Sequence, residues 1–474
     1  MSGLLSLIQP IAPLFVMTVA TAVALTAIAI RRSFLVTLLI SFAGLIGALL
    51  VLPWMAHSSA AAAMFADDAL SVGFAGIILL TSVLVLVVAA SYWLDVAAEP
   101  REEYPLLLLV GTIGAVTVAL GINFIPLFIG LETLTLAMIG MIAYPRWRPE
   151  ALEAALKYLV LSGMSSALLL LGLGLVDLAT GHLSLAAVQN ASGAAMLLLP
   201  ALALIIVSAG FKLSVVPFHI WVPDVYAGAP APSAAFLATV PKIAVIAVVA
   251  RLLFADATIP PTLGLAMTIA GVASMLIGNL LALLQQNLKR ILGYSSIAQL
   301  GYVLVALLAA GALGRSALLF FVAMYSVTVI GAFGVLSALS VAESERDMDR
   351  VSDIRGLFWR HPLIAGILTL ALLSLAGIPP ALGFMAKMYV MAAGVHSHLR
   401  ILIATMVVSS VIGLFYYLRV IIAMTQAPDS ADAPAEGRLS LPVNAAIGLI
   451  GAVILGFGIM PQPLLSLLKA VFHS

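Results

Sequence analysis

The chain contains no cysteine and very little charge. Of its 474 residues, only 9% are Asp, Glu, Lys or Arg, and 64% are hydrophobic. A soluble domain is about half apolar and about a quarter charged, so this composition excludes an ordinary aqueous globular protein. The absence of cysteine excludes disulfides, thiolate chemistry and cysteine-ligated iron–sulfur clusters within this chain.

Signals of nucleic-acid and nucleotide binding are also missing. The formal net charge is +1, from 21 Lys and Arg against 20 Asp and Glu, so the balance suggests no nucleic acid or strongly acidic partner. The sequence has neither a Gly-x-Gly-x-x-Gly loop nor a Gly-x-x-x-x-Gly-Lys-Ser/Thr loop. The candidates for function are therefore the few polar groups set in apolar segments.

Long apolar runs dominate the chain, whose mean hydropathy is +1.22. A helix needs about 20 apolar residues to cross a bilayer, and the sequence contains about 14 such runs. It therefore predicts an all-α polytopic membrane protein in which a single membrane domain takes up the whole chain. The predicted spans are 11–30, 34–54, 73–92, 104–121, 123–143, 153–177, 197–219, 230–254, 262–284, 288–309, 316–341, 362–396, 399–425 and 441–468.

Two of these spans are expected to be broken. The run 362–396 would be about 52 Å long as one helix, against an apolar core of about 30 Å. Gly377-Ile378-Pro379-Pro380 is the predicted break. The stretch from Pro217 to Pro232 is similarly rich in proline, which removes helix hydrogen bonds, and predicts a second break.

The distribution of basic residues between loops predicts the orientation. Cytoplasmic loops carry an excess of Lys and Arg, and the excess here is satisfied if both termini face away from the cytoplasm. The inner loops then hold Arg31, Arg32, Arg101, Arg146, Arg148, Lys289, Arg290, Arg346, Arg350, Arg355, Arg360 and Arg438, and the outer side holds Arg251, Arg315, Arg400 and Lys469.

The remaining basic residues lie inside the predicted spans. A charge near the bilayer centre costs at least about 2.5 kcal/mol, so one without a function tends to be lost. Four of the five are lysines, although arginines outnumber lysines in the chain. A desolvated lysine can exchange its proton near neutral pH, whereas arginine stays charged, so this choice favours a proton relay. The embedded charges are Lys157, Lys212, Lys242, Lys387 and Arg419, with Glu132 as the main buried acid.

Each of the three deeper lysines has a structural interpretation beside the functional one. Lys212 and Lys387 lie next to the predicted breaks, where freed carbonyls and water can solvate a charge, and Lys242 follows Pro241 in the middle of a span. We favour proton transfer over a structural ion pair at all three. Glu132 can neutralise a lysine, and the same pairing would tune when that lysine titrates.

The other polar residues are less decisive. Lys157 lies about one turn inside its span and can snorkel to the inner surface, and Arg419 is interpreted as a snorkelling anchor. His219 and Asp224 can relay protons from the inner side or simply cap the break. The charged run 343–360 is expected to be a solvated loop or a short amphipathic helix.

Three long motifs resemble the antiporter-like subunits of respiratory complex I. Residues 210–230 read Gly-Phe-Lys-Leu-Ser-Val-Val-Pro-Phe-His-Ile-Trp-Val-Pro-Asp-Val-Tyr-Ala-Gly-Ala-Pro, residues 286–297 read Gln-Asn-Leu-Lys-Arg-Ile-Leu-Gly-Tyr-Ser-Ser-Ile, and residues 375–380 read Leu-Ala-Gly-Ile-Pro-Pro, followed by Gly383, Phe384 and Lys387. The residues that follow Pro223-Asp224 are most similar to those of the N-type subunit. The resemblance extends from the fourth predicted span to the thirteenth.

The resemblance implies two inverted five-helix repeats, at 104–254 and 262–425, after three spans in 1–103 and before a last span at 441–468. Each repeat would contain one broken helix. Both broken spans carry Gly-Phe followed by a lysine, Lys212 or Lys387. Because the two spans run in opposite directions, these lysines should lie on opposite sides of the midplane.

Site roles follow from the resemblance position by position. Glu132 would pair with Lys212, Lys242 would be the central lysine, and Lys387 would face the outer exit. Lys157 and His219 would be auxiliary. A lysine at position 387, rather than a glutamate, argues against the middle of the three related subunits.

The implied function is proton translocation within an NADH:quinone oxidoreductase, with no redox chemistry, cofactor or metal in this chain. FMN and iron–sulfur clusters would belong to partner subunits. The partners would be other membrane subunits, including related antiporter-like ones, a peripheral redox arm and the lipid bilayer. The location would be a bacterial inner membrane, with both termini in the periplasm. A multisubunit cation/proton antiporter module and a non-pumping scaffold remain alternatives.

Cysteine labelling tests the orientation cleanly, because the chain has no cysteine of its own. Residues 57–70 and 178–195 are expected outside, and the loops holding Arg148 and Arg350 inside. A cysteine at position 62 (Ala62→Cys) should therefore react with a membrane-impermeant reagent only from the outer face. Reaction from the cytoplasmic face alone would reverse the whole assignment.

Overall fold

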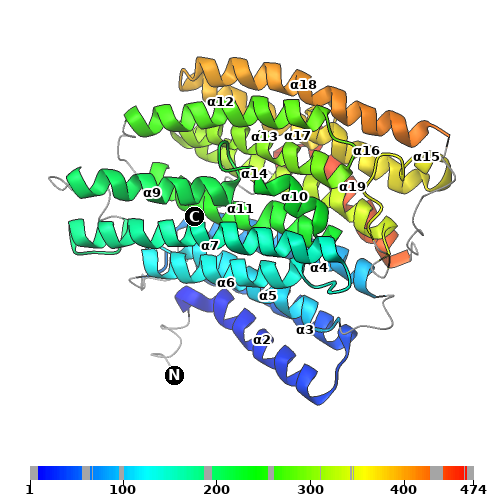
Figure 1. Cartoon of the computed structure of the whole chain (residues 1–474), viewed down its shortest axis with the longest axis horizontal. Helices are drawn as coiled ribbons and strands as arrows, with labels where there is room; N and C mark the ends of the chain where they lie inside the picture. Colours follow the sequence, from blue (N-terminus) through cyan, green and yellow to red (C-terminus); the bar gives the residue numbers. More distant parts are fainter. Residues whose placement is uncertain are drawn as a thin grey trace.

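The fold is built from helices that run side by side across the molecule (Figure 1). The computed structural model describes residues 9–55, 64–66, 68–94, 101–185, 195–254, 261–309, 311–341, 344, 346–427, 441–463 and 465–466. Within these residues it contains isolated β-bridges but no strand. The elements are η1 (Gln9–Ile11), α2 (Ala12–Ile30), α3 (Phe34–Met55), α4 (Ala69–Trp93), α5 (Glu103–Leu120), α6 (Phe124–Ile142), α7 (Pro149–Thr180), α9 (Ala195–Leu213), α10 (Trp221–Gly228), α11 (Ala231–Phe254), α12 (Pro261–Leu283), α13 (Leu288–Leu308), α14 (Gly311–Leu339), α15 (Leu357–Arg360), α16 (Pro362–Ala376), α17 (Leu382–His396), α18 (Arg400–Thr425) and α19 (Leu441–Ile459).

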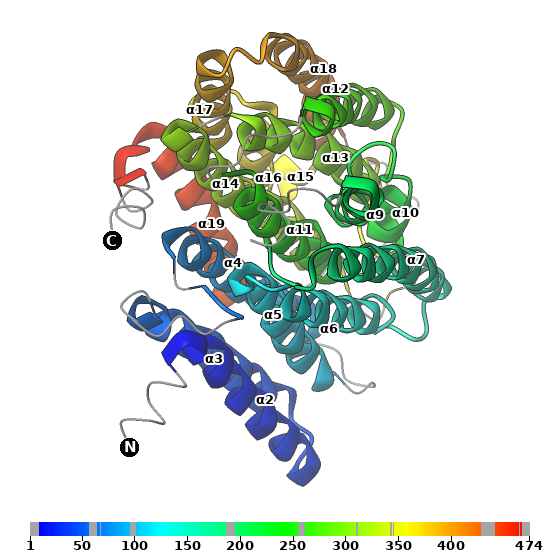
Figure 2. The same ribbon diagram turned by 90° about the vertical axis from the view of Figure 1, so that its left-hand side faces the viewer.

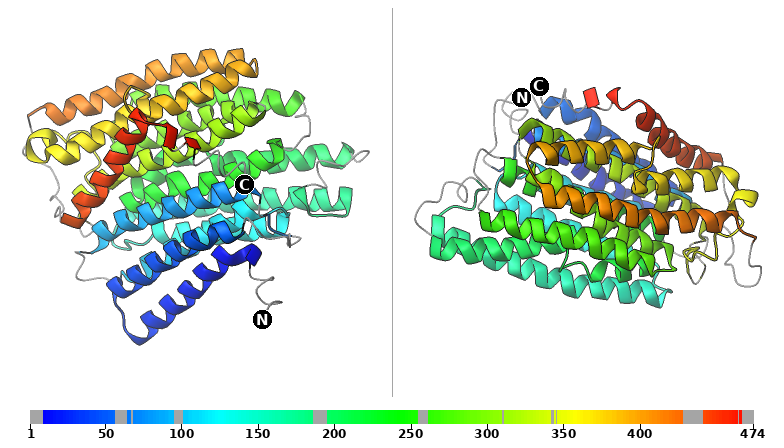
Figure 3. Two further views of the ribbon diagram at one scale, coloured as in Figure 1. Left: turned by 180° about the vertical axis from the view of Figure 1, so that it is seen from behind. Right: turned by 90° about the horizontal axis from the view of Figure 1, so that it is seen from above.

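The predicted fold class is confirmed. Twelve helices in the described part of the chain are long and apolar enough to cross a membrane. The two other predicted spans correspond to the α16–α17 pair and to α19, which lies obliquely across its neighbours (Figure 3). The chain is therefore a multi-pass membrane protein.

Both predicted breaks are present. The span that begins with α9 stops at Leu213 and continues as the short helix α10. The span that begins with α16 ends at Gly377, whose φ of 82° is left-handed and suits glycine, and resumes as α17. At this second break a Cβ on Gly383 would lie 1.8 Å from the carbonyl oxygen of Ser374, so only glycine lets α17 start so close to α16.

The two halves of the bundle share one plan. In α5–α11 and again in α12–α18, five spans follow one another and the fourth is broken. The first two spans of each half cross closely at glycine: a Cβ on Gly114 would lie 2.6 Å from Gly130 O, and one on Gly301 would lie 2.9 Å from Gly271 O. The repeat boundaries at 104–254 and 262–425 stay a prediction.

The interior of the bundle is made by α11, α13 and α14 (Figure 2). The α2–α3 hairpin stands at one edge, while α12 and α18 form the opposite edge. The surrounding protein buries 89% of the residues in the most apolar stretch of α13, and the same share in α14. In the span Gln9–Ile30 it buries only 22% of that stretch. Polar side chains on α13 and α14 therefore face other helices rather than lipid.

The loops gather at two ends, as the alternation of spans requires. At one end, which we call the basic end, Arg32 pairs with Glu102 and Glu103, and Arg148 pairs with Asp347. At the other end, Arg251 reaches Asp68, and Asn123 bridges to Ser184. Which end faces the cytoplasm stays a prediction. Position 62 lies outside the described residues, as do parts of both loops expected on the outer side.

Candidate functional site

Lys212 ends α9 immediately before the first break. It is only 6% exposed. Its ammonium group donates hydrogen bonds to Thr135 Oγ1 of α6 at 2.9 Å and to Ser162 Oγ of α7 at 2.8 Å. The charge is thus met by two hydroxyl groups from neighbouring helices.

Glu132 does not contact Lys212 directly. It lies one helical turn before Thr135, is half-buried, and accepts a hydrogen bond from Ser166 Oγ. Among the described residues no ion pair within 4.0 Å joins Glu132 to Lys212, although the carboxylate is close enough for its charge to act on the lysine. The predicted pair is thus not in direct contact, because hydroxyl groups and not the carboxylate surround the ammonium group of Lys212. The functional coupling of the two residues stays a prediction.

Lys242 is the most deeply buried of the three lysines, at 1% exposure. It follows Pro241 in α11, and its Nζ donates to Ser296 Oγ of α13 at 2.5 Å. Ser296 also shares a 2.5 Å hydrogen bond with the hydroxyl of Tyr325. On another side, Nζ lies 5.6 Å from the centroid of the Tyr226 ring of α10, where the π-face favours a cation.

Lys387 lies against the second break. Its Nζ donates to Ala376 O, the last residue of α16, at 2.9 Å and to Ser410 Oγ at 3.3 Å. It also lies 4.9 Å from the centroid of the Tyr302 ring. A Cβ at Gly377 would lie 2.7 Å from Lys387 Cδ, so glycine leaves room for this side chain. The broken helix thus supplies a free carbonyl to the lysine.

A polar stripe on α13 connects the central lysine with Lys387. Ser296, Gln299 and Tyr302 follow one another at three-residue spacing. Gln299 Nε2 donates to Leu375 O at 3.0 Å, and its buried Oε1 has no hydrogen-bond partner. Our sequence reasoning missed this stripe, because hydroxyl and amide groups carry no charge to flag them. Their spacing within an apolar span was the available signal.

Among the described residues, none of these three lysines has a carboxylate within ion-pair distance. The partners of Lys212, Lys242 and Lys387 are hydroxyl groups, one backbone carbonyl and two aromatic rings. Such groups can solvate an ammonium ion, and they can also form hydrogen bonds with a neutral amine. In the described residues, therefore, none of these lysines is held by an ion pair, although the charge of Glu132 acts on Lys212 from a distance.

The auxiliary residues lie nearer the basic end. Lys157 is 44% exposed in its side chain and pairs with Glu153 at 2.7 Å and Asp224 at 3.3 Å. Asp224 also accepts from Arg290 at 2.5 Å, so it joins α10 to α7 and α13. His219 is half-buried within the break, between Pro217 and the start of α10.

Arg419 is more than a surface anchor. Its guanidinium donates to Leu283 O at 2.8 Å and to Gln285 O at 2.6 Å. These carbonyls lie at the C-terminus of α12, where backbone acceptors lack intrahelical partners and a cation is favourable. The Arg419 side chain therefore ends at backbone carbonyls of the protein. The snorkelling interpretation predicts instead that it ends at the membrane surface.

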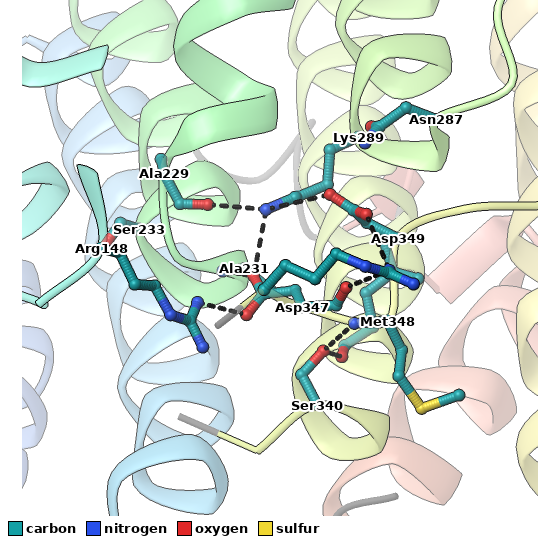
Figure 4. Close-up of polar contacts among 12 residues, drawn as sticks. Arg148, Ala229, Ala231, Ser233, Asn287, Lys289, Ser340, Asp347, Met348 and Asp349 are labelled. Atoms are coloured by element: carbon teal, nitrogen blue, oxygen red, sulfur yellow. Dashed lines mark hydrogen bonds and ion pairs between the residues drawn. The ribbon is translucent and has the colours of Figure 1, made fainter. Parts of the chain in front are cut away.

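The charged run 343–360 is only partly solvated: Arg350 and Arg360 are exposed and the run ends in the short helix α15, but its described aspartates are buried. Asp347 is 1% exposed and accepts hydrogen bonds from Arg148 at 2.7 Å and Lys289 at 3.0 Å (Figure 4). The hydroxyl of Tyr92 at 2.6 Å and the amide of Ala231 at 3.0 Å complete its shell. Asp349 also pairs with Lys289, and Asp353 pairs with Arg346, so the described aspartates of this segment face cations instead of water.

This cluster joins the two halves of the bundle. Arg148 precedes α7, Lys289 lies in the first turn of α13, and Ala231 begins α11, which carries Lys242. Burial alone would raise the pKa of Asp347, but the attraction of Lys289 and Arg148 and the hydrogen bonds from Tyr92 and Arg148 hold it well below its ordinary value. Asp347 therefore stays ionised, and its ion pairs with Arg148 and Lys289 link the two halves of the bundle.

A polar cavity of about 350 Å³ adjoins the cluster at the basic end. Its lining includes Lys157, Asp224, Lys289, Arg290 and Asp347. By contrast, the small cavity beside Lys212 is lined almost entirely by apolar side chains of α5, α6, α7, α9 and α11. Water can thus enter at the basic end, while the surroundings of Lys212 are dry on that apolar side.

Comparison with known proteins identifies the family. The protein family described as "NADH:quinone oxidoreductase/Mrp antiporter, TM" matches residues 122–413 of the sequence. The chain belongs to this family. A chain of respiratory complex I from Thermus thermophilus, solved with bound aureothin, is 30% identical, with a TM-score of 0.82 over 96% of this chain and 98% of that chain.

Two further solved structures share the fold at lower identity. A chain of an archaeal membrane-bound sulfane sulfur reductase is 23% identical, covers 99% of this chain and 97% of its own, and has a TM-score of 0.83. A chain of the Mrp complex from a Dietzia species is 21% identical, covers 98% of this chain and 97% of its own, and has a TM-score of 0.84. At these identities the likeness shows the fold alone.

The Asp347 cluster yields a prediction about stability. Asp347→Asn would remove the acid that Arg148 and Lys289 share and leave Lys289 with Asp349 alone, and breaking a buried ion pair costs about 3–5 kcal/mol. We expect a clear loss of folded protein in the membrane and a lower thermal unfolding midpoint in detergent. Asp177→Asn, at an exposed acid of α7, is the matched control and should behave like the parent.

The effect of Asp347→Asn should not depend on pH between about 5 and 8. A carboxyl group whose pKa is lowered by folding contributes stability above its unfolded pKa of about 3.9, and loses it only as the pH falls toward its folded pKa. The difference in midpoint between parent and variant should therefore stay constant across this range. If Asp347→Asn were as stable as Asp177→Asn, Asp347 would not be the residue that links the two halves of the bundle.

Proposed function

We propose that the chain is the N-type proton-translocating membrane subunit of an NADH:quinone oxidoreductase. The observation that carries this proposal is the set of three buried lysines, Lys212, Lys242 and Lys387, whose contacts in the described part of the chain are with neutral groups. Electron transfer from NADH to quinone would take place in partner subunits that hold FMN and iron–sulfur clusters. The 30% identity to a complex I chain supports this assignment.

Proton translocation would depend on how well each ammonium ion is solvated. A buried cation is expensive unless water, hydroxyl groups or an acid compensate it. A change in the charge of one site alters the balance at the next, so protonation states along a row of such sites are coupled. A charge shift arriving from neighbouring subunits could then drive uptake at one lysine and release at another.

The proposed route begins at the basic end. The polar cavity beside Lys157 and Asp224, with His219 in the nearby break, would supply protons from the cytoplasm to the row. Lys212 and Lys242 would hold them within the first half of the bundle. The α13 stripe of Ser296, Gln299 and Tyr302 would lead toward Lys387 and the outer exit.

A cation/proton antiporter subunit is the second candidate, because an Mrp chain has the same fold. That function would give Na⁺-dependent proton exchange without flavin or iron–sulfur centres. The two candidates separate on gentle solubilisation of the tagged chain from its native membrane. Flavin and iron–sulfur signals in the purified complex support the oxidoreductase, and their absence together with Na⁺-dependent exchange would overturn it.

Lys387 tests whether a titrating group is needed or only a fixed charge. Arginine at this position keeps a cation beside Ala376 O and Ser410 Oγ, but it stays protonated under all physiological conditions. We therefore expect Lys387→Arg to assemble normally and yet to lower the proton-to-electron ratio in proteoliposomes as far as Lys387→Ala does. The amount of assembled complex is measured in parallel.

A control exchange between arginine and lysine accompanies this test. Arg251→Lys keeps a positive charge facing Asp68 at the end opposite the basic end, outside the proposed route. It should assemble and pump like the parent. If Lys387→Arg also pumps like the parent, Lys387 serves as a fixed charge and the route needs another titrating residue.

Glu132 should affect pumping without being needed for assembly. Glu132→Gln keeps an acceptor for Ser166 Oγ but removes the negative charge near Lys212. Because the loss of this charge removes electrostatic stabilisation of the Lys212 ammonium ion, we expect slower pumping by a complex that still assembles. Normal proton uptake by the reconstituted variant complex would remove the coupling between Glu132 and Lys212.

A further inference from the structure

Three helices that pack against one another, α13, α17 and α18, place hydroxyl groups around Lys387 (Figure 2). Lys387 itself belongs to α17, and α13 contributes Tyr302. α18 contributes two adjacent serines, Ser409 and Ser410. In the proposed route Tyr302 only leads toward Lys387, and neither serine has a part in it. The hydroxyl groups on the far side of the lysine therefore lack a function.

The hydrogen bonds of these residues form one chain that starts at the lysine. Lys387 Nζ donates to Ser410 Oγ at 3.3 Å, and Ser410 Oγ donates to the hydroxyl of Tyr302 at 3.4 Å. The Tyr302 hydroxyl shares a 2.9 Å hydrogen bond with Ser409 Oγ, which donates to Met406 O at 3.1 Å. Three hydroxyl groups thus connect the ammonium group with a backbone carbonyl of α18.

The protons in this chain all point away from the lysine. A serine or tyrosine hydroxyl has one proton to donate. Ser409 donates its proton to Met406 O, so Tyr302 is the donor in the bond that it shares with Ser409. Ser410 donates in turn to Tyr302, and Lys387 donates to Ser410. In this arrangement a proton that leaves the lysine can pass from oxygen to oxygen before any hydroxyl group has to turn.

The chain leads toward the end of the molecule opposite the basic end. α18 begins at that end with Arg400 and runs to Thr425. Along this helix Ser410, Ser409 and Met406 are successively nearer to Arg400, and Met406 lies about 9 Å from it at 1.5 Å per residue. Tyr302 and Ser409 are only 2% and 0% exposed, so protein and not lipid surrounds this part of the chain. The distribution of basic residues predicts that the end with Arg400 faces outward.

We propose that Ser410, Tyr302 and Ser409 form the proton exit from Lys387, an inference that rests on the proposed function. The Lys387 ammonium group gives a proton to Ser410 Oγ, whose own proton moves to the Tyr302 oxygen. The Tyr302 proton moves to Ser409 Oγ, and the Ser409 proton passes to a water molecule that enters from the outer end. One proton leaves the lysine, one reaches the water, and each hydroxyl group again holds one proton. The hydroxyl groups then turn back before the next transfer.

A purely structural role of these residues predicts a different result for two variants. If the surroundings only solvate the ammonium ion, its direct partners suffice, namely Ala376 O, Ser410 Oγ and the face of the Tyr302 ring. Tyr302→Phe keeps this ring and removes the hydroxyl. Ser409→Ala removes a hydroxyl that bonds to Tyr302 and Met406. Both variants interrupt the chain and leave the direct partners of the lysine in place.

The test measures the proton-to-electron ratio of the whole complex in proteoliposomes, together with the amount of assembled complex. We expect Tyr302→Phe and Ser409→Ala to assemble normally and to lower the ratio to the value found for Lys387→Ala. Ser326→Ala is the matched control, because Ser326 is a buried serine of α14 that donates to Val322 O in its own helix. It should pump like the parent.

The two variants lie in different helices, so the test remains decisive if one of them fails to fold. A parent-like ratio in either assembled variant, beside a lowered ratio in Lys387→Ala, would overturn the proposed exit and leave the proposed function intact. A parent-like ratio in Lys387→Ala would overturn both the exit and the route through Lys387. Failure of the exit and failure of the proposed function can therefore be told apart.

Discussion

Keeping charge out of hydrocarbon is the constraint on which the rest of this structure depends. An embedded charge costs at least about 2.5 kcal/mol, and the chain meets this cost in two different ways. Asp347 is matched by Arg148, Lys289 and two further hydrogen-bond donors, which makes its charge permanent. The membrane lysines, such as Lys242, receive only neutral partners. The first arrangement links the two halves of the fold, and the second is the one on which the proposed proton transfer depends.

The broken helices obey the same constraint. Irregular backbone is tolerated at membrane depth only where protein or water satisfies its polar groups. At the second break, Ala376 O accepts from Lys387, so the freed carbonyl and the buried ammonium satisfy each other. The first break places Tyr226 of α10 over Lys242. Both breaks pack against α13, which explains why this helix is so deeply buried and why its few polar residues matter.

One fold serves complexes with different chemistry. The same arrangement of helices occurs in chains of a complex I, a sulfane sulfur reductase and an Mrp complex. The fold alone therefore does not identify the reaction in which this chain takes part. The buried lysines belong to the chain itself. In the proposed function, the reaction that moves protons among them would be supplied by partner subunits, which is why co-purification decides between the two candidate functions.

The spans, both breaks and the embedded lysines followed from the sequence alone, because hydropathy, proline content and charge are properties of local segments. The partners of those charges were decided only by the tertiary structure. Asp347 sits in a segment of balanced charge that looks solvated, and only the approach of Arg148 and Lys289 from distant positions buries it. Glu132 likewise meets Ser166 rather than Lys212. A charge in the sequence shows that compensation is needed, but which group provides it depends on how the helices pack.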